Sequence, residues 1–194
     1  RWLESEMVRE LSKEDSEKWI SKILGTIDLI PDIAKTTKQW YESEKEELKR
    51  FKNIIVIGYD KCLPAATEGA LKILETVQCC VRYYELEEFM HGIYHGIDKS
   101  TLILALGNQS RHLNRMVRLL GYLKEHKNAT TYLISQNKVI KHDFSYPFIE
   151  DSLFVSFEYL TVLQVLGELM CHDRGVDLYD TVDENFHEYM ESYV

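Results

Sequence analysis

The chain has no apolar run long enough to cross a membrane, which takes about 20 consecutive residues. It also lacks the pattern of a secretory signal. Its apolar and charged fractions, 45% and 28%, are those of an ordinary globular protein, which excludes disordered and fibrous classes. We therefore expect a cytoplasmic protein without a membrane partner.

The chain also has fewer positively charged than negatively charged side chains. The formal net charge of −9 disfavours non-specific binding to nucleic acid or to anionic membranes, because both carry negative charge. The four cysteines have no zinc-ligand spacing and are expected to be reduced thiols. Gly58-Tyr-Asp-Lys-Cys lacks the GxGxxG fingerprint, so neither a nicotinamide nor a flavin is indicated and no cofactor is expected.

Three regions are indicated along the chain. Residues 1–50 are charged and helical in pattern, and we expect a helical arm that packs on the domain. In this arm Ser12 to Asp15 resembles a capping box, and Pro31 suits the first turn of a second helix. Residues 51–182 form the domain, and residues 183–194 a tail that either frays or folds over the site. Because the chain begins at Arg1 rather than Met, we expect it to be part of a longer polypeptide.

Strands and helices alternate in the domain. Expected strands are Asn53–Gly58, Cys79–Glu85, Thr101–Gly107, Thr130–Ser135 and a short one at Leu153–Phe157. Expected helices are Ala65–Val77, Arg111–Glu125 and Glu158–His172, with a connector at Glu85–Gly96. This order predicts an α/β fold of three layers, α/β/α, with a flavodoxin-like, doubly wound parallel sheet of five strands.

Three charged residues share one face of the first domain helix. Glu68, Lys72 and Glu75 stand at i, i+4 and i+7. The alternative is a solvated face, on which each pair contributes only about 0.2–0.5 kcal/mol. The apolar residues around them predict a largely buried helix, so the charges should face a cleft, a partner or an interface.

Two other segments offer polar groups. His91 and His95 are four apart, but Gly92 and Gly96 make a poor helix, so no metal site is expected. His91 is instead a candidate acid or base, against the alternative of a solvated loop histidine. Ser110 ends a loop that follows a buried strand, where it either helps to receive an anion or caps the next helix.

These segments resemble the sugar isomerase (SIS) family of phosphosugar-binding domains. The residues that carry the resemblance are Ile-Val-Ile-Gly58, Glu68-Gly-Ala-Leu-Lys72-Ile-Leu-Glu75, Tyr84–Gly92, the Ile97-Asp98 turn and the strand from Leu102. The match covers about Ile54 to Asp180. It is strongest to the second of the two such domains in the isomerase half of glucosamine-6-phosphate synthase and in fructosamine-6-phosphate deglycases.

The resemblance implies a role for each matching position. Glu75 falls on the glutamate that shuttles a proton between C1 and C2 of an open-chain sugar. Glu68 and Lys72 fall on its acidic and basic neighbours. His91 falls on the histidine that opens the sugar ring, which a homodimer supplies across its interface. Gly58 and Ser110 are the matching candidates for substrate binding.

Two departures from the family pattern limit what carries over. No segment matches the Ser/Thr-rich SxSGxT phosphate loop of the family's first domain. The synthase's C-terminal lysine is also absent, and His187 is the candidate for its place.

The first hypothesis is therefore that the chain is the C-terminal half of a two-domain isomerase or deglycase that acts on an amino- or ketoamine-sugar phosphate. The fragment alone is expected to be inactive. The alternative is a non-catalytic phosphosugar-sensing domain.

Overall fold

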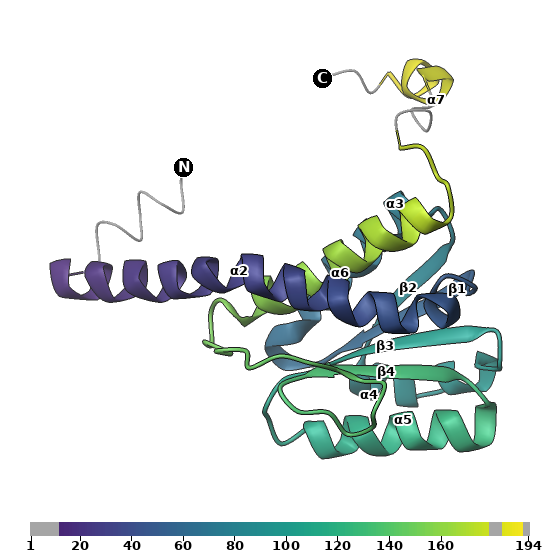
Figure 1. The fold of residues 1–194 in the computed structure, drawn as a ribbon, viewed down its shortest axis with the longest axis horizontal. Coiled ribbons are helices and arrows are strands. Elements are labelled where there is room, and N and C mark those ends of the chain that lie inside the picture. Colours follow the sequence, from purple (N-terminus) through teal and green to yellow (C-terminus); the bar gives the residue numbers. More distant parts are fainter. Residues whose placement is uncertain (1–11, 179–183, 192–194) are drawn as a thin grey trace.

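The computed structural model describes residues 12–178 and 184–191, and a parallel sheet of five strands lies at its centre (Figure 1). The strands are β1 (Asn53–Gly58), β2 (Cys80–Glu85), β3 (Thr101–Gly107), β4 (Thr130–Ser135) and β5 (Phe144–Ser145). Their order is β2-β1-β3-β4-β5 and every pairing is parallel. This is the flavodoxin-like, doubly wound order, which confirms the predicted fold class.

Helices cover both faces of the sheet. They are α2 (Lys13–Leu48), α3 (Leu63–Val77), α4 (Leu86–Met90), α5 (Leu113–Lys127), α6 (Val155–Asp173) and α7 (Glu184–Tyr189), with short 3-10 turns at η1 (Asp60–Cys62) and η2 (Ile93–Gly96). Figure 1 shows α2, α3 and α6 on one side of the sheet and α4 and α5 on the other.

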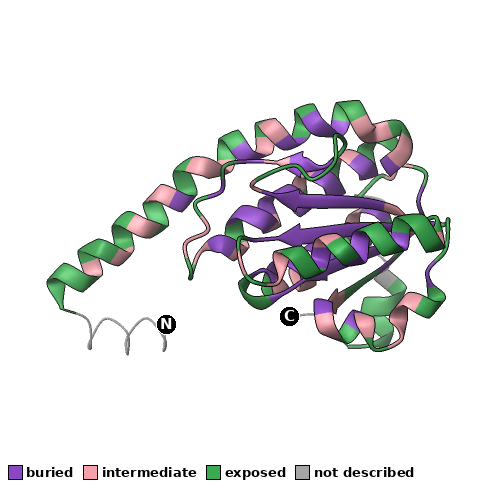
Figure 2. Cartoon of the chain, turned by 90° about the horizontal axis from the view of Figure 1, so that it is seen from below, coloured by how far each residue is buried: buried purple, intermediate pink, exposed green. Residues whose placement is uncertain are grey.

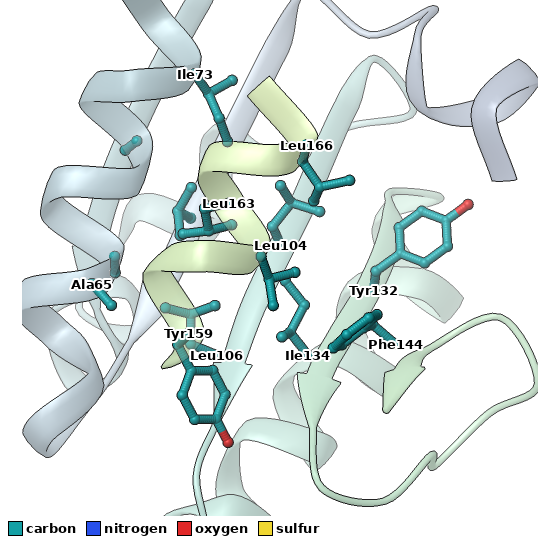
Figure 3. Close-up of a cluster of buried hydrophobic side chains, with 14 of the residues drawn as sticks. Ala65, Ile73, Leu104, Leu106, Tyr132, Ile134, Phe144, Tyr159, Leu163 and Leu166 are labelled. Carbon is teal, nitrogen blue, oxygen red and sulfur yellow. The ribbon is translucent and has the colours of Figure 1, made fainter. Parts of the chain in front are cut away.

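Successive side chains of each strand point to opposite faces of the sheet, and this divides the core into two clusters. Ile54 and Val56 of β1 pack with α2, α3 and α6, whereas Ile55 and Ile57 pack with α4 and α5. The strands are buried on both faces, which explains their nearly continuous apolar runs. Figure 3 shows part of the first cluster, where Leu163 of α6 lies between α3 and the sheet.

Helix α2 differs from the prediction at Pro31. Ser12 caps its start by accepting a hydrogen bond from the backbone N–H of Asp15, as expected, but the helix then runs unbroken through Pro31 to Leu48. Packing beyond the proline explains this continuity. Trp40 is buried there and its Nε1 donates to the carbonyl of His142 at 2.8 Å, which holds the second half of α2 on the domain. The first half projects beyond the sheet (Figure 2).

The expected strand at Leu153–Phe157 is wrong. Leu153 and Phe154 lie in the turn that enters α6, and Val155–Phe157 begin that helix. The fifth strand lies earlier, at Phe144–Ser145. Its two residues pair with Ile134 and Ser135. The carboxylate of Asp143 organises the loop before it by accepting from the N–H groups of Leu133, Val139 and Ile140. So short a strand has no periodicity of its own to detect.

The Glu85–Gly96 connector contains local structure that the sequence pattern did not specify. Glu85 caps α4 by accepting from the N–H groups of Glu87 and Glu88.

None of the helices in the described residues is long and apolar enough to cross a membrane.

Candidate active site

The three charged residues of α3 form one ion-paired group on its outer face. The Nζ atom of Lys72 lies 2.8 Å from Oε2 of Glu75 and 3.5 Å from Oε1 of Glu68. The hydrogen bond to Glu75 is the largest cause that raises the pKa of Lys72 above its ordinary value. The lysine is therefore a firmly charged ammonium between two carboxylates.

Close packing on α6 decides that this charged face points outward. Gly69 lies against Leu163, and Gly167 lies against Ile73 and Thr76. The small residues let the two helices approach, and the opposite side of α3 remains free. This outcome differs from the expectation of a largely buried helix, because Leu71 and Leu74 are 45% and 42% exposed.

An open hollow of about 740 Å³ borders the charged face at the carboxyl ends of α3 and α6. Its lining consists of Lys72, Thr76, Gln164, Glu168, Cys171, His172 and Gly175–Leu178. Lys72 thus faces a space that can hold a ligand, while the Glu75 side chain is 48% exposed. A carboxylate so accessible to water needs a cover before it can work as a shielded base.

His91 lies on the other side of the sheet from this group. It caps the end of α4, and the α4 residues Leu86 and Phe89 belong to the core cluster of α5. Its side chain is exposed. Because the sheet separates His91 from Glu75, one copy of the chain does not bring the two together.

Gly58 ends β1 and Ser110 lies in the loop after β3, both at the carboxyl edge of the sheet. A Cβ at Gly58 would stand 2.9 Å from Cβ of Ala66 and 3.0 Å from the carbonyl oxygen of Cys62, so the tight turn into α3 requires glycine there. The Oγ atom of Ser110 accepts from the N–H of His112 at 3.1 Å. Ser110 therefore organises the turn before α5.

His187 lies in α7, where its ring centroid is 5.6 Å from that of Phe186. Residues 185–191 are exposed, and Figure 1 shows α7 apart from the sheet. The predicted tail also includes residues 183 and 192–194, which lie outside the described residues.

No cluster of three or more His, Cys, Asp or Glu in residues 12–178 and 184–191 is arranged to hold a metal ion.

The sequence analysis missed an acidic pair made of the buried Glu158 and the half-buried Glu150. Glu158 of α6 is fully buried, and burial raises the pKa of its carboxyl from 4.5 to about 7. Its Oε2 atom accepts from the N–H of Glu150 at 3.2 Å. The carboxylate of Glu150 accepts in turn from the hydroxyl of Tyr159 at 2.7 Å and from the N–H of Gln109 at 2.8 Å. The sequence signal that could have revealed this pair is an acidic residue within the apolar run of α6.

Comparison with known proteins relates the chain to enzymes of sugar phosphates. Residues 47–139 match the family model described as SIS domain. A glutamine–fructose-6-phosphate aminotransferase (isomerizing) from Wigglesworthia glossinidia brevipalpis is 26% identical over 172 residues, which cover 84% of this chain and 28% of that protein.

Two solved structures share the fold of this chain, and each is 28% identical to it over the aligned residues. A Clostridium difficile 630 protein assigned as a phosphosugar isomerase gives a TM-score of 0.84 and covers 95% of this chain and 52% of its own. A Salmonella typhimurium LT2 protein assigned as sugar-binding gives a TM-score of 0.72 and covers 81% and 48%. The chain thus spans just over a quarter of the curated relative and about half of these solved chains.

Proposed function

We propose that this chain, whose residues 47–139 match the SIS domain family model, forms part of an enzyme that moves a proton between C1 and C2 of a phosphorylated amino or ketoamine sugar. It is a phosphosugar isomerase-like domain related to the isomerizing aminotransferases. The observation that carries the proposal is the Glu68–Lys72–Glu75 ion-paired group, whose Lys72 lines a hollow large enough for a small polar ligand.

Each of the three residues has a chemical task in this reaction. The Glu75 carboxylate removes the proton from one carbon, and the electron pair of that C–H bond becomes the C1–C2 double bond. The π pair of the neighbouring carbonyl moves onto its oxygen, which takes up a proton to complete the enediol. Glu75 then returns the proton to the other carbon, while the hydroxyl on the first carbon gives up its proton and becomes the new carbonyl, which completes an isomerisation without any oxidant or reductant. The Lys72 ammonium stabilises the developing negative oxygen, and Glu68 holds the lysine in place. When C1 carries an amine, the same proton transfer gives a C1=N imine, and water hydrolyses it to the C1 aldehyde and the free amine.

The site needs a second domain or a second copy of the chain to close it. Leu71 and Leu74 flank the charged group and remain exposed, as do Ile20, Ile23, Leu24 and Ile27 on the α2 arm. Neighbouring exposed apolar side chains mark surfaces that another protein covers. In a homodimer such a cover excludes water from Glu75 and lets the His91 of one copy reach the sugar bound by the other.

Replacing Glu75 with Gln in the full-length protein tests the proton shuttle. Glu75→Gln should abolish turnover of a fructosamine 6-phosphate or a ketose 6-phosphate while leaving its binding almost unchanged. Glu42→Gln is the matched control, because Glu42 makes an exposed ion pair of the same 2.8 Å length with Lys45. Retained turnover in Glu75→Gln would refute the role assigned to this residue.

The second candidate is a phosphosugar sensor without catalysis. The likeness to a protein assigned as sugar-binding favours it, as does the separation of His91 from Glu75 within one chain. A thermal-shift screen of the full-length protein against sugar phosphates, followed by product analysis, separates the two candidates. Stabilisation without product supports the sensor, and product formation supports the enzyme.

A further inference from the structure

A second hollow lies on the face of the sheet opposite to α3. It measures about 570 Å³ and is open to solvent between the α4–η2 segment and α5. Its lining consists of Met90, Tyr94, Arg111, Asn114, Arg115, Arg118, Leu119 and Tyr122. Three arginines and two tyrosines around an apolar floor of Met90 and Leu119 are the usual components of a site for an anion that carries a ring.

The charge of this hollow contrasts with that of the whole chain. Residues 111–127 carry five cationic side chains against the single acid Glu125, although the formal net charge of the chain is −9. Arg115 is neutralised by Glu87, which receives its Nε at 2.5 Å and its Nη2 at 2.9 Å. Arg111 donates its Nε to His112 at 3.1 Å, which leaves its other N–H groups available. Positive charge therefore remains in the hollow.

Arg118 makes no hydrogen bond or ion pair with any of the described residues. It follows Arg115 by one helical turn on α5, so the two guanidinium groups share one face of the helix. A guanidinium presents several donors in a fixed plane that matches a phosphate oxygen pair. Arg118, together with Arg111, is thus the natural contact for phosphate.

The tyrosines give the hollow a surface for a planar ring. Tyr94 and Tyr122 meet edge to face, with ring centroids 6.3 Å apart and planes at 85°. His95 packs against the Tyr94 ring with centroids 4.2 Å apart, and His126 against the Tyr122 ring at 4.8 Å. Tyr122 is 44% exposed, so part of its ring remains accessible. Aromatic faces stack well on nucleic bases, and such stacking tolerates any base because every base has a π-face.

We propose that this hollow binds a nucleotide, with its phosphates on Arg111 and Arg118 and its base against Tyr94 and Tyr122. A long polyanion such as RNA is disfavoured, because the net charge of −9 repels it away from this one basic hollow. The volume suits a ligand larger than a simple phosphate ion, and the sheet separates the hollow from the α3 group. Within one chain, the nucleotide site is therefore distinct from the α3 part of the proposed sugar-phosphate site.

Calorimetric titration of the full-length protein with ATP, GTP, CTP and UTP tests the proposal. We expect at least one of the four to bind. Arg118→Ala should weaken its binding by about tenfold or more, and Tyr122→Ala by about fivefold or more. Lys124→Ala is the control, because it removes a positive charge from the same helix outside the hollow. Glu87→Gln should strengthen binding, because it releases Arg115.

Inorganic tripolyphosphate serves as the probe that lacks a base, and it should bind more weakly than the nucleotide. Equal binding of tripolyphosphate together with an unaffected Tyr122→Ala variant would overturn the assignment to nucleotides. Absence of binding by all four nucleotides at millimolar concentration would overturn it as well. So would an Arg118→Ala variant that binds as tightly as the Lys124→Ala control. None of these outcomes depends on turnover of a sugar phosphate.

Discussion

Gly69 of α3 touches the side chain of Leu163 on α6 so closely that no larger residue fits. A Cβ at residue 69 would stand 2.1 Å from Cδ1 of Leu163 and 2.8 Å from its Cβ. This contact fixes which side of α3 faces α6. The Glu68–Lys72–Glu75 group is turned outward as a consequence.

Gly69→Ala should lower the free energy of unfolding by about 1–3 kcal/mol, because a well-packed interface must shift to accept a methyl group. Gly121→Ala on α5 is the control, since a Cβ there meets nothing within 4 Å. In a helix interior that change should be stabilising by about 0.5–1 kcal/mol. Urea unfolding measures both, and equal stability of the two variants would contradict this account of the α3–α6 contact.

Lys72→Met should separate function from stability. Exposed ion pairs add little to stability because water screens them, so the free energy of unfolding should change little. Turnover of the sugar phosphate should fall at least a hundredfold, because the developing oxyanion loses its cation. Lys45→Met is matched in exposure and in ion-pair length, and it should keep full turnover. A loss of turnover in both variants would point to a general effect of charge instead.

Glu158→Gln should flatten the pH dependence of stability. The carboxyl pKa is raised from 4.5 to about 7, so the folded chain holds this proton more tightly than the unfolded chain does. The stabilising effect is complete below about pH 4.5 and is lost as the pH rises through 7. The loss is roughly 3 kcal/mol, since one unit of pKa corresponds to about 1.4 kcal/mol.

Urea unfolding at pH 5 and pH 8 measures this effect. The Gln side chain carries no charge, so Glu158→Gln should gain stability over the native chain at pH 8 and differ little at pH 5. Glu168→Gln, at an exposed position of the same helix, should show no such difference between the two pH values. Identical pH profiles for the native chain and Glu158→Gln would argue against a buried, protonated Glu158.

Pro31→Ala should strengthen the middle of α2. Proline has no N–H to donate to the carbonyl of Ile27, and alanine restores that donor in a helix that already runs through the site. Amide hydrogen exchange in residues 24–34 should slow severalfold. Pro64→Ala in the first turn of α3 is the control, because an N–H there has no partner within the helix. Unchanged exchange in α2 would indicate that the helix is already interrupted at Pro31.

Much of the fold was predictable because its signals are local. The apolar runs of β1 and β3 are buried on both faces, so the sequence identifies them as central parallel strands without ambiguity. Two-residue β5 carries no such signal and was misplaced. Continuity of α2 through Pro31 was also missed, because it depends on the packing of Trp40 far along the helix.

Spacing within the sequence alone determined that Glu68, Lys72 and Glu75 share a face, because the helical period fixes the positions of residues within one element. Only the tertiary structure decided that this face points outward, that His91 lies across the sheet and that Glu150 meets Glu158. Those relationships depend on contacts between segments that are far apart in the sequence, or on which face of one element packs against another. They follow from which surfaces pack most closely, a property that no single segment contains.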